Sequence, residues 1–146
     1  MKWTAAILAG WGALLAWSTF QAALPAAWWF DAGAVRVFDT TVSEPCARMD
    51  FDRVIEREFY AQWTVTLMKQ NGTGGYFTYD TFSGANDYRP ENELPEQLDL
   101  CWWSWADTLR LLPGTYKVHT LWKLQVDGGT REIRRTSNAF EVRAAG

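Results

Sequence analysis

The segment PGTYKVHTLWKLQV, residues 113–126, carries the clearest strand pattern in the chain. Its side chains alternate between two faces: Tyr116, Val118, Thr120, Trp122, Leu124 and Val126 lie on one, and Lys117, His119, Leu121, Lys123 and Gln125 on the other. A half-buried antiparallel strand requires this alternation, because successive side chains point to opposite faces of a sheet. The segment therefore predicts a strand with one face in a core.

Turn signals divide the rest of the chain into similar short segments. The strongest is Asn71-Gly72-Thr73-Gly74-Gly75, because Asn-Gly and Gly-Gly favour the positive φ angles of tight hairpins. Strands are predicted at residues 35–42, 53–69, 76–82, 97–105, 116–126, and 131–135 with 139–142. Residues 53–69 form one long bent strand or two with a bulge, with a helical turn at 51–58 as the alternative, and residues 83–96 form a polar loop. Seven or so short strands predict an all-β sandwich.

Residues 112–118, LPGTYKV, resemble the entry into the penultimate strand of immunoglobulin-like and fibronectin type III-like domains. In such domains a tyrosine hydroxyl near this corner bonds back to the chain, and the resemblance gives that role to Tyr116. Trp63 resembles the core tryptophan, and Trp122 is expected to be structural as well. No cysteine lies two residues after Tyr116, so the usual disulfide between paired strands is not expected. The fold implied is an immunoglobulin-like antiparallel β-sandwich preceded by one N-terminal apolar helix.

The start of the chain is apolar. Residues 3–30 carry no charge, and Lys2 precedes them. A membrane-spanning helix needs about 20 mostly apolar residues, and a cation on the near side predicts a cytoplasmic N-terminus. Trp28, Trp29 and Phe30 fit an aromatic belt at the outer interface. We therefore expect a signal-anchor helix in residues 1–30 and an extracytoplasmic β-sandwich domain, periplasmic or extracellular, in residues 31–146.

Two other interpretations of this segment stay open. One is a cleaved signal peptide, with Ala16-Trp17-Ser18 or Ala32-Gly33-Ala34 as the small-x-small site, which would make the protein secreted. The other is a buried helix of a soluble protein, although a surface helix would show a polar stripe that this segment lacks. Both the anchor and the signal peptide export the same domain.

The cysteines and the charge balance narrow the possible partners. In an oxidising compartment, Cys46 and Cys101 predict one disulfide, with two buried thiols as the alternative. With His119 as the single histidine, no metal site and no cofactor is predicted. The formal net charge of −3 becomes −4 without Lys2, so nucleic acid is not expected as a partner.

Two local strings are candidates for binding. Residues 99–105, DLCWWSW, place Trp102, Trp103 and Trp105 so close together that they cannot all point inward from one strand. Exposed tryptophans stack on sugar rings or anchor protein partners, whereas core filling and packing against the membrane-proximal segment is the structural alternative. Tyr88 and Arg89 lie in residues 86–90, NDYRP, which would form a recognition tip within the polar loop.

The expected function is a non-enzymatic envelope interaction or structural module that binds a protein or glycan outside the cytoplasm. The acidic residues Asp87, Glu91, Glu93 and Glu96 match neither a calcium loop nor a known catalytic signature. A secreted carbohydrate-active enzyme using this acidic loop remains an alternative. A second alternative is a phage-encoded accessory acting on the host envelope, in lysis or superinfection exclusion, because the layout is similar to small anchored proteins of bacteria and their phages.

Overall fold

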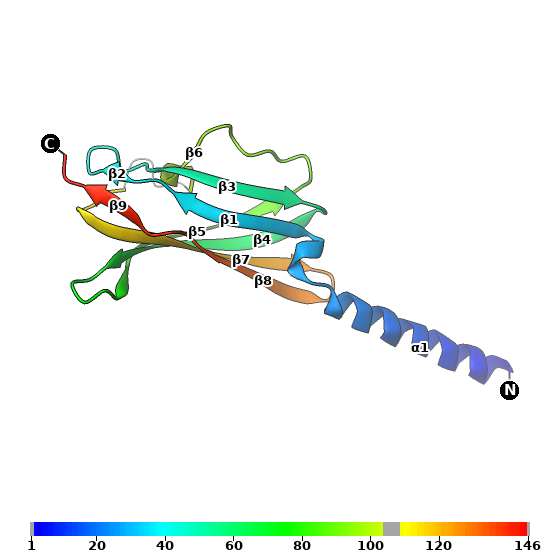
Figure 1. Ribbon diagram of the computed structural model, residues 1–146. Helices are drawn as coiled ribbons and strands as arrows, with labels where there is room; N and C mark the ends of the chain where they lie inside the picture. The colour runs from blue at the N-terminus through cyan, green and yellow to red at the C-terminus, as the bar shows by residue number, and fades with distance from the viewer. Residues whose placement is uncertain (1, 104–108, 146) are drawn as a thin grey trace.

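The computed structural model describes residues 2–103 and 109–145. Over these ranges the protein is mostly β, with two sheets in two layers and one apolar helix that projects from them (Figure 1). The helices are α1 (Lys2–Ala23) and the short 3-10 helices η1 (Ala26–Trp28) and η2 (Leu100–Trp103). The strands are β1 (Phe30–Val37), β2 (Thr40–Thr41), β3 (Arg48–Ile55), β4 (Phe59–Gln70), β5 (Tyr76–Tyr88), β6 (Leu98–Asp99), β7 (Gly114–Val126), β8 (Gly129–Thr136) and β9 (Phe140–Arg143).

β7 lies at the centre of the larger sheet, as its alternation predicts. That sheet has the order β2-β9-β7-β4-β5, with β8 also paired to β7, and the smaller sheet has the order β1-β3-β6. The inward face of β7 is buried at Tyr116, Val118, Thr120, Trp122 and Leu124. Each large apolar side chain buried in this way contributes about 1.5–3 kcal/mol relative to exposure, so β7 supplies a large part of the core.

The segment over residues 53–69, predicted as one bent strand or two with a bulge, contains two strands that belong to different sheets. β3 ends at Ile55 and β4 begins at Phe59, and both of these side chains are buried. The exposed residues Glu56, Arg57 and Glu58 carry the chain from one sheet to the other. The helical turn considered at 51–58 does not form, because residues 48–55 are extended and paired with β1.

The hairpin predicted at residues 71–75 is confirmed between β4 and β5. The Asn71 side-chain oxygen accepts hydrogen bonds from the backbone N–H groups of Thr73 and Gly75, both at 3.0 Å. Gly74 has a φ of +89°, which favours glycine. β5 continues to Tyr88, so residues 83–88, predicted as loop, are strand. The strand pair at the end of the chain is confirmed as β8 and β9, separated by residues 137–139.

Two of the residues expected in an aromatic belt belong to the core instead. Trp29 and Phe30 are buried, and β1 begins at Phe30 rather than at residue 35. The Phe30 ring lies 5.5 Å from the Phe59 ring and 5.3 Å from the Trp122 ring, both of which belong to the opposite sheet. The aromatic-belt prediction is therefore wrong for these two residues, while Trp28 remains exposed.

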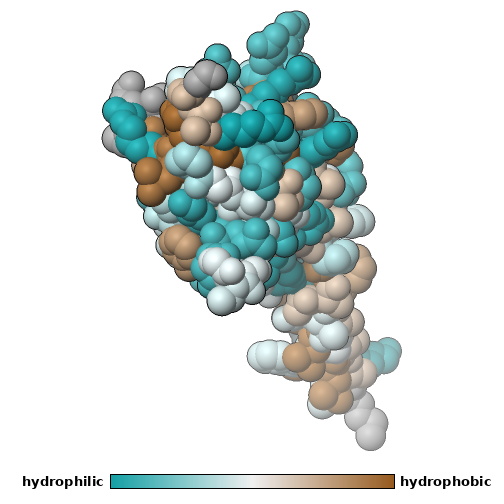
Figure 2. Space-filling view, turned by 60° about the vertical axis from the view of Figure 1, so that its left-hand side comes forward, coloured by the Kyte–Doolittle hydropathy of each residue, from teal (hydrophilic) through white to brown (hydrophobic). Residues whose placement is uncertain are grey.

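The predicted apolar helix is confirmed as α1. None of its residues is buried, so the prediction of a buried core helix is wrong. By its length and composition α1 is able to cross a membrane. A signal sequence near the N-terminus would have the same length and composition. Figure 2 shows α1 as a largely white to brown projection from the two-sheet domain, whose visible face is mainly hydrophilic.

The disulfide between Cys46 and Cys101 is confirmed. It lies just beyond the β3–β6 ladder, in which Arg48 pairs with Asp99, and it joins residues with a sequence separation of 55. In the chain-entropy model a cross-link over such a loop stabilises the fold by about 4 kcal/mol. The short strand β6 and the following helix η2 are thereby tied to β3.

Tyr116 makes the corner contact that the resemblance implies. Its hydroxyl donates a hydrogen bond of 2.6 Å to the carbonyl of Leu112, four residues upstream. Burial raises the pKa of Tyr116 to about 12, with a further contribution from Tyr79, while the bond to Leu112 opposes the shift. The hydroxyl therefore stays protonated in the folded protein at a pH where a free tyrosine ionises.

We expect Tyr116→Phe to cost about 1 kcal/mol of unfolding free energy at neutral pH, because one buried hydrogen bond is lost. The raised pKa also predicts that stability falls from about pH 10 to about pH 12, because the unfolded chain releases the proton that the folded chain retains. Tyr116→Phe removes the contribution of this tyrosine to the fall of the unfolding free energy with pH, which is up to about 1.4 kcal/mol per pH unit. Urea unfolding at several pH values measures both effects. Tyr60→Phe, at an exposed tyrosine, is the control, and an equal change in both variants would contradict the assignment.

Candidate functional site

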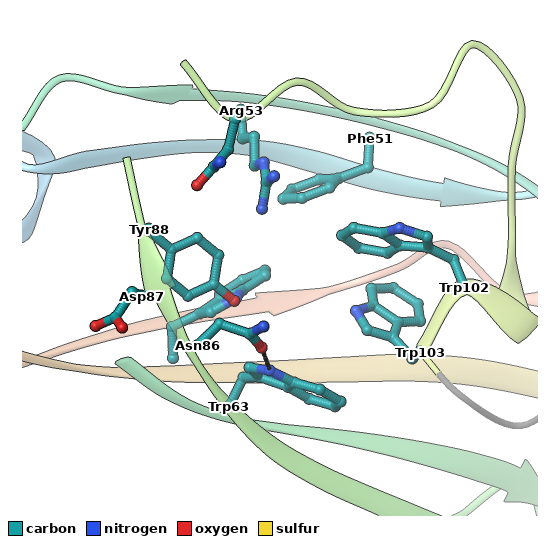
Figure 3. A pocket seen from close by; sticks show the side chains of 10 residues that line it. Phe51, Arg53, Trp63, Asn86, Asp87, Tyr88, Trp102 and Trp103 are labelled. Carbon is teal, nitrogen blue, oxygen red and sulfur yellow. Dashed lines mark hydrogen bonds between the residues drawn. The ribbon is translucent and has the colours of Figure 1, made fainter. Parts of the chain in front are cut away.

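A cleft of about 370 Å³ lies between side chains of the two sheets and of η2. Six aromatic side chains line it, namely Phe51, Trp63, Tyr88, Trp102, Trp103 and Trp122, together with Arg53, Asn86, Asp87 and Asn92 (Figure 3). Its volume lies within the range of small-molecule sites. Beside the cleft, β6 has only two residues, and the long strand β5 forms an edge of the larger sheet.

Strand alternation places the lining residues. Phe51 and Arg53 lie two residues apart on β3 and therefore share a face, and Asn86 and Tyr88 do the same on β5. Phe51 stacks on the buried Trp122, with ring centroids 5.6 Å apart and an angle of 11° between the planes. Figure 3 shows Arg53 and Phe51 on one side of the opening, Tyr88 next to Arg53, and Trp102 and Trp103 opposite Tyr88.

Arg53 is the cation of the cleft. Its guanidinium lies 5.4 Å from the centre of the Tyr88 ring and 5.7 Å from that of Trp102, which are cation–π distances. Its Nε is buried without a hydrogen-bond partner, and no carboxylate of the described residues lies within ion-pair distance of it. Burial lowers the pKa of Arg53, and the neighbouring Tyr88 opposes this. An arginine nevertheless remains charged at neutral pH.

Trp63 packs at the edge of the core and also lines the cleft. It is half-buried, its Nε1 donates a hydrogen bond of 2.8 Å to the side-chain oxygen of Asn86, and its ring lies over Gly84 on the neighbouring strand. Its cross-strand partner Trp122 is the buried tryptophan of β7, as expected for a structural residue. Trp63 thus packs against the core cluster and also helps to shape the opening, whereas Trp122 is buried.

Tyr88 and Arg89 do not form an exposed recognition tip. Tyr88 ends β5, is buried, and stacks on Phe59 with ring centroids 4.9 Å apart. Burial raises the pKa of Tyr88, while the charge of Arg53 and the indole of Trp122 oppose the shift. Arg89 is exposed, forms an ion pair of 3.4 Å with the exposed Glu58, and does not line the cleft.

The tryptophan string adopts a helical turn instead of the predicted strand. β6 covers only Leu98–Asp99, and Trp102 and Trp103 lie on η2. Trp103 is buried and Trp102 is 36% exposed, so one ring fills the interior and the other forms the rim. The disulfide at Cys101 fixes this turn next to β3. Trp105 lies outside the described residues.

Sequence reasoning did not predict that Arg53, Phe51, Asn86 and Asn92 form one site, and it placed Asn86 only in the loop tip 86–90. The sequence pattern did single out Arg53, because it lies on the same face of β3 as Met49, Phe51 and Ile55, all of which are buried. A cation on an otherwise apolar face is expensive unless it is paired or has a function. No comparable local signal identifies Asn86 or Asn92, because their positions depend on where β5 ends.

Of the acidic residues considered from the sequence, only Asp87 lines the cleft. Glu91, Glu93 and Glu96 are exposed, and none of them is among the residues that line it. Cys46, Asp99 and Cys101 form the only group in residues 2–103 and 109–145 with a metal-like clustering of ligand atoms, but the two sulfurs are bonded to each other.

Comparisons of this chain with protein-family models, curated proteins and solved structures found no match. The chemistry of the cleft is therefore inferred from its own residues.

We expect Gly84→Ala to displace the Trp63 ring, because a Cβ at Gly84 would overlap it. Overpacking of this kind typically costs about 1–3 kcal/mol, and the bond from Trp63 to Asn86 should be lost. Near-UV circular dichroism and urea unfolding measure the two effects. The matched control is Gly72→Ala, since a Cβ at Gly72 would meet no atom within 4 Å. An unchanged aromatic signal in Gly84→Ala would contradict this account of the cleft wall.

Proposed function

We propose that this protein is a membrane-anchored, non-enzymatic binding module that acts outside the cytoplasm. The apolar helix α1 supports attachment to a membrane, and the disulfide supports an oxidising compartment. A sandwich with a disulfide on one side and an apolar helix at one end is suited to presenting a binding surface close to a bilayer. The anchor raises the effective concentration of that surface for partners in the envelope.

The strand order supports an immunoglobulin-like arrangement for the sandwich. One sheet holds β1, β3 and β6, and the other holds β9, β7, β4 and β5 in that order, which parallels the division of strands in variable-type immunoglobulin domains. The Tyr116 contact at the start of β7 agrees with this arrangement. The disulfide departs from it, because it links the flanks of β3 and β6 in one sheet instead of joining the two sheets.

The observation that carries the proposal is the aromatic cleft around Arg53. Aromatic rings present flat apolar faces, and most of the interior of a ligand site is of this kind, with a few polar groups that set orientation. Trp102 and Trp63 are only partly buried, so part of each ring is exposed at the opening. A protein or glycan partner that inserts an apolar ring or sugar face here would fit these contacts.

The helix and the sandwich are joined without a free linker. Arg131 of β8 donates hydrogen bonds from Nε to the carbonyl of Leu24 at 2.8 Å and from a terminal nitrogen to the carbonyl of Gln21 at 2.9 Å. These carbonyls lie at and just beyond the end of α1, where an arginine is favourable for the exposed carbonyl groups. The cleft would therefore keep a defined orientation relative to the anchor.

Partner binding through the cleft predicts that Trp102→Ala weakens capture of envelope partners. The full-length tagged protein is crosslinked in native envelopes, purified, and compared with Trp102→Ala. Loss of a hot-spot tryptophan typically costs 2 kcal/mol or more, so capture should fall by at least about tenfold. Phe77→Ala, at an exposed aromatic residue far along β5, serves as the control and should retain capture. Equal capture by both variants and the unaltered protein would exclude the cleft as the contact surface.

Membrane anchoring by α1 predicts that the protein stays in the membrane pellet after alkaline carbonate extraction. N-terminal sequencing of the purified protein should then start upstream of α1, because an anchor is retained. A mature protein that starts after Ser18 or Ala34 and is recovered in the soluble exported fraction would instead establish a cleaved signal peptide. Recovery of the intact chain with soluble cytoplasmic enzymes would contradict export altogether.

A further inference from the structure

The side-chain amides of Asn86 and Asn92 are oriented so that their oxygens, and not their NH₂ groups, are hydrogen-bonded to described residues. The Asn86 side-chain oxygen accepts from Trp63 Nε1, and the Asn92 side-chain oxygen accepts from the backbone N–H of Arg89 at 2.8 Å. Both partners are able only to donate, which fixes the orientation of the two amides. The NH₂ groups of Asn86 and Asn92 therefore remain available as donors.

Arg53 adds a positive charge to these donors. Its guanidinium makes no hydrogen bond and no ion pair with the described residues, and its contacts are the faces of Tyr88 and Trp102. Asp87 is the nearest acidic residue of the lining, but Figure 3 shows its carboxylate at the outer side of Tyr88, turned away from Arg53. A partly buried charge without a counter-ion is costly, so an anion that enters the cleft would relieve this cost.

On the basis of the proposed function, we propose that the cleft binds a saccharide that carries a carboxylate, with the carboxylate on Arg53 and the sugar ring against the tryptophan faces. A guanidinium matches a carboxylate geometrically and forms charge-assisted hydrogen bonds with it. One arginine balances one negative charge, which favours a carboxylate over a dianionic phosphate. The NH₂ groups of Asn86 and Asn92 complement hydroxyl and ring oxygens.

The same donor excess disfavours a peptide. An extended peptide brings its own N–H groups, which need acceptors. Each amide oxygen already accepts one hydrogen bond and has one lone pair left, and the Asp87 carboxylate lies at the outer side of Tyr88. Sugar hydroxyls act as either donor or acceptor, so they satisfy a donor-rich site. The aromatic faces of Trp63 and Trp102 then contribute apolar contact without requiring further hydrogen bonds.

The test compares a uronate oligosaccharide with its carboxyl-reduced, neutral counterpart. Binding of each to the full-length protein in detergent is measured by isothermal titration calorimetry. We expect the acidic ligand to bind about 10- to 100-fold more tightly, as expected for a hydrogen-bonded charge pair. Arg53→Gln should abolish this preference, and Arg53→Lys should restore only part of it, because a lysine lacks the planar fork. Arg89→Gln, at an exposed arginine outside the cleft, should preserve the preference.

The outcomes separate this inference from the proposed function. Equal binding of both oligosaccharides would overturn the carboxylate assignment and leave glycan binding intact. Binding of neither, with a protein captured in a Trp102-dependent manner, would overturn the inference and retain a binding module. Binding of neither, with capture insensitive to Trp102→Ala, would overturn both. The comparison of two ligands on the unaltered protein decides the question even if Arg53→Gln does not fold.

Discussion

The contact of Trp122 with Phe51 and Phe30 joins the two sheets. Trp122 comes from the centre of β7, while Phe51 and Phe30 come from β3 and β1 of the smaller sheet, with ring centroids 5.6 and 5.3 Å away. Because β7 pairs with β4, β8 and β9, this contact holds most of the larger sheet against the smaller one. The same ring also lines the cleft, so the packing that closes the sandwich ends where the candidate site begins.

The sequence predicted those parts of the fold that depend on only a few consecutive residues. The alternation over residues 116–126 and the Asn71–Gly75 turn reproduce β7 and the β4–β5 hairpin, because side-chain period and positive φ are properties of a few consecutive residues. The crossing at residues 56–58 was not predicted. It contains neither glycine nor proline, and only the burial of Ile55 and Phe59 against opposite sheets distinguishes it from a continuous strand.

Hydrophobicity alone also does not distinguish a bilayer from a protein core. Residues 3–30 form one uncharged run, yet α1 has no buried residue while Trp29 and Phe30 are buried in the sandwich. Both environments exclude water, and both select the same side chains. The boundary is set by Pro25 and by the partners of Phe30 across the core, and those partners are distant in sequence. The sequence predicted that Trp102 and Trp103 contribute to a binding site. It did not predict how they are arranged, since η2 replaces the expected strand.

The position of the disulfide connects the fold to the cleft. A bridge between the two sheets would stabilise the core, but Cys46–Cys101 instead extends the ladder between β3 and β6, where that ladder has only two residue pairs. β3 carries Phe51 and Arg53, and η2 carries Trp102 and Trp103, so the bridge ties together the two elements that form opposite walls of the opening. With so few backbone pairs between them, these walls would separate more readily than the core would unfold. The covalent link therefore holds the two walls of the cleft together in addition to stabilising the fold.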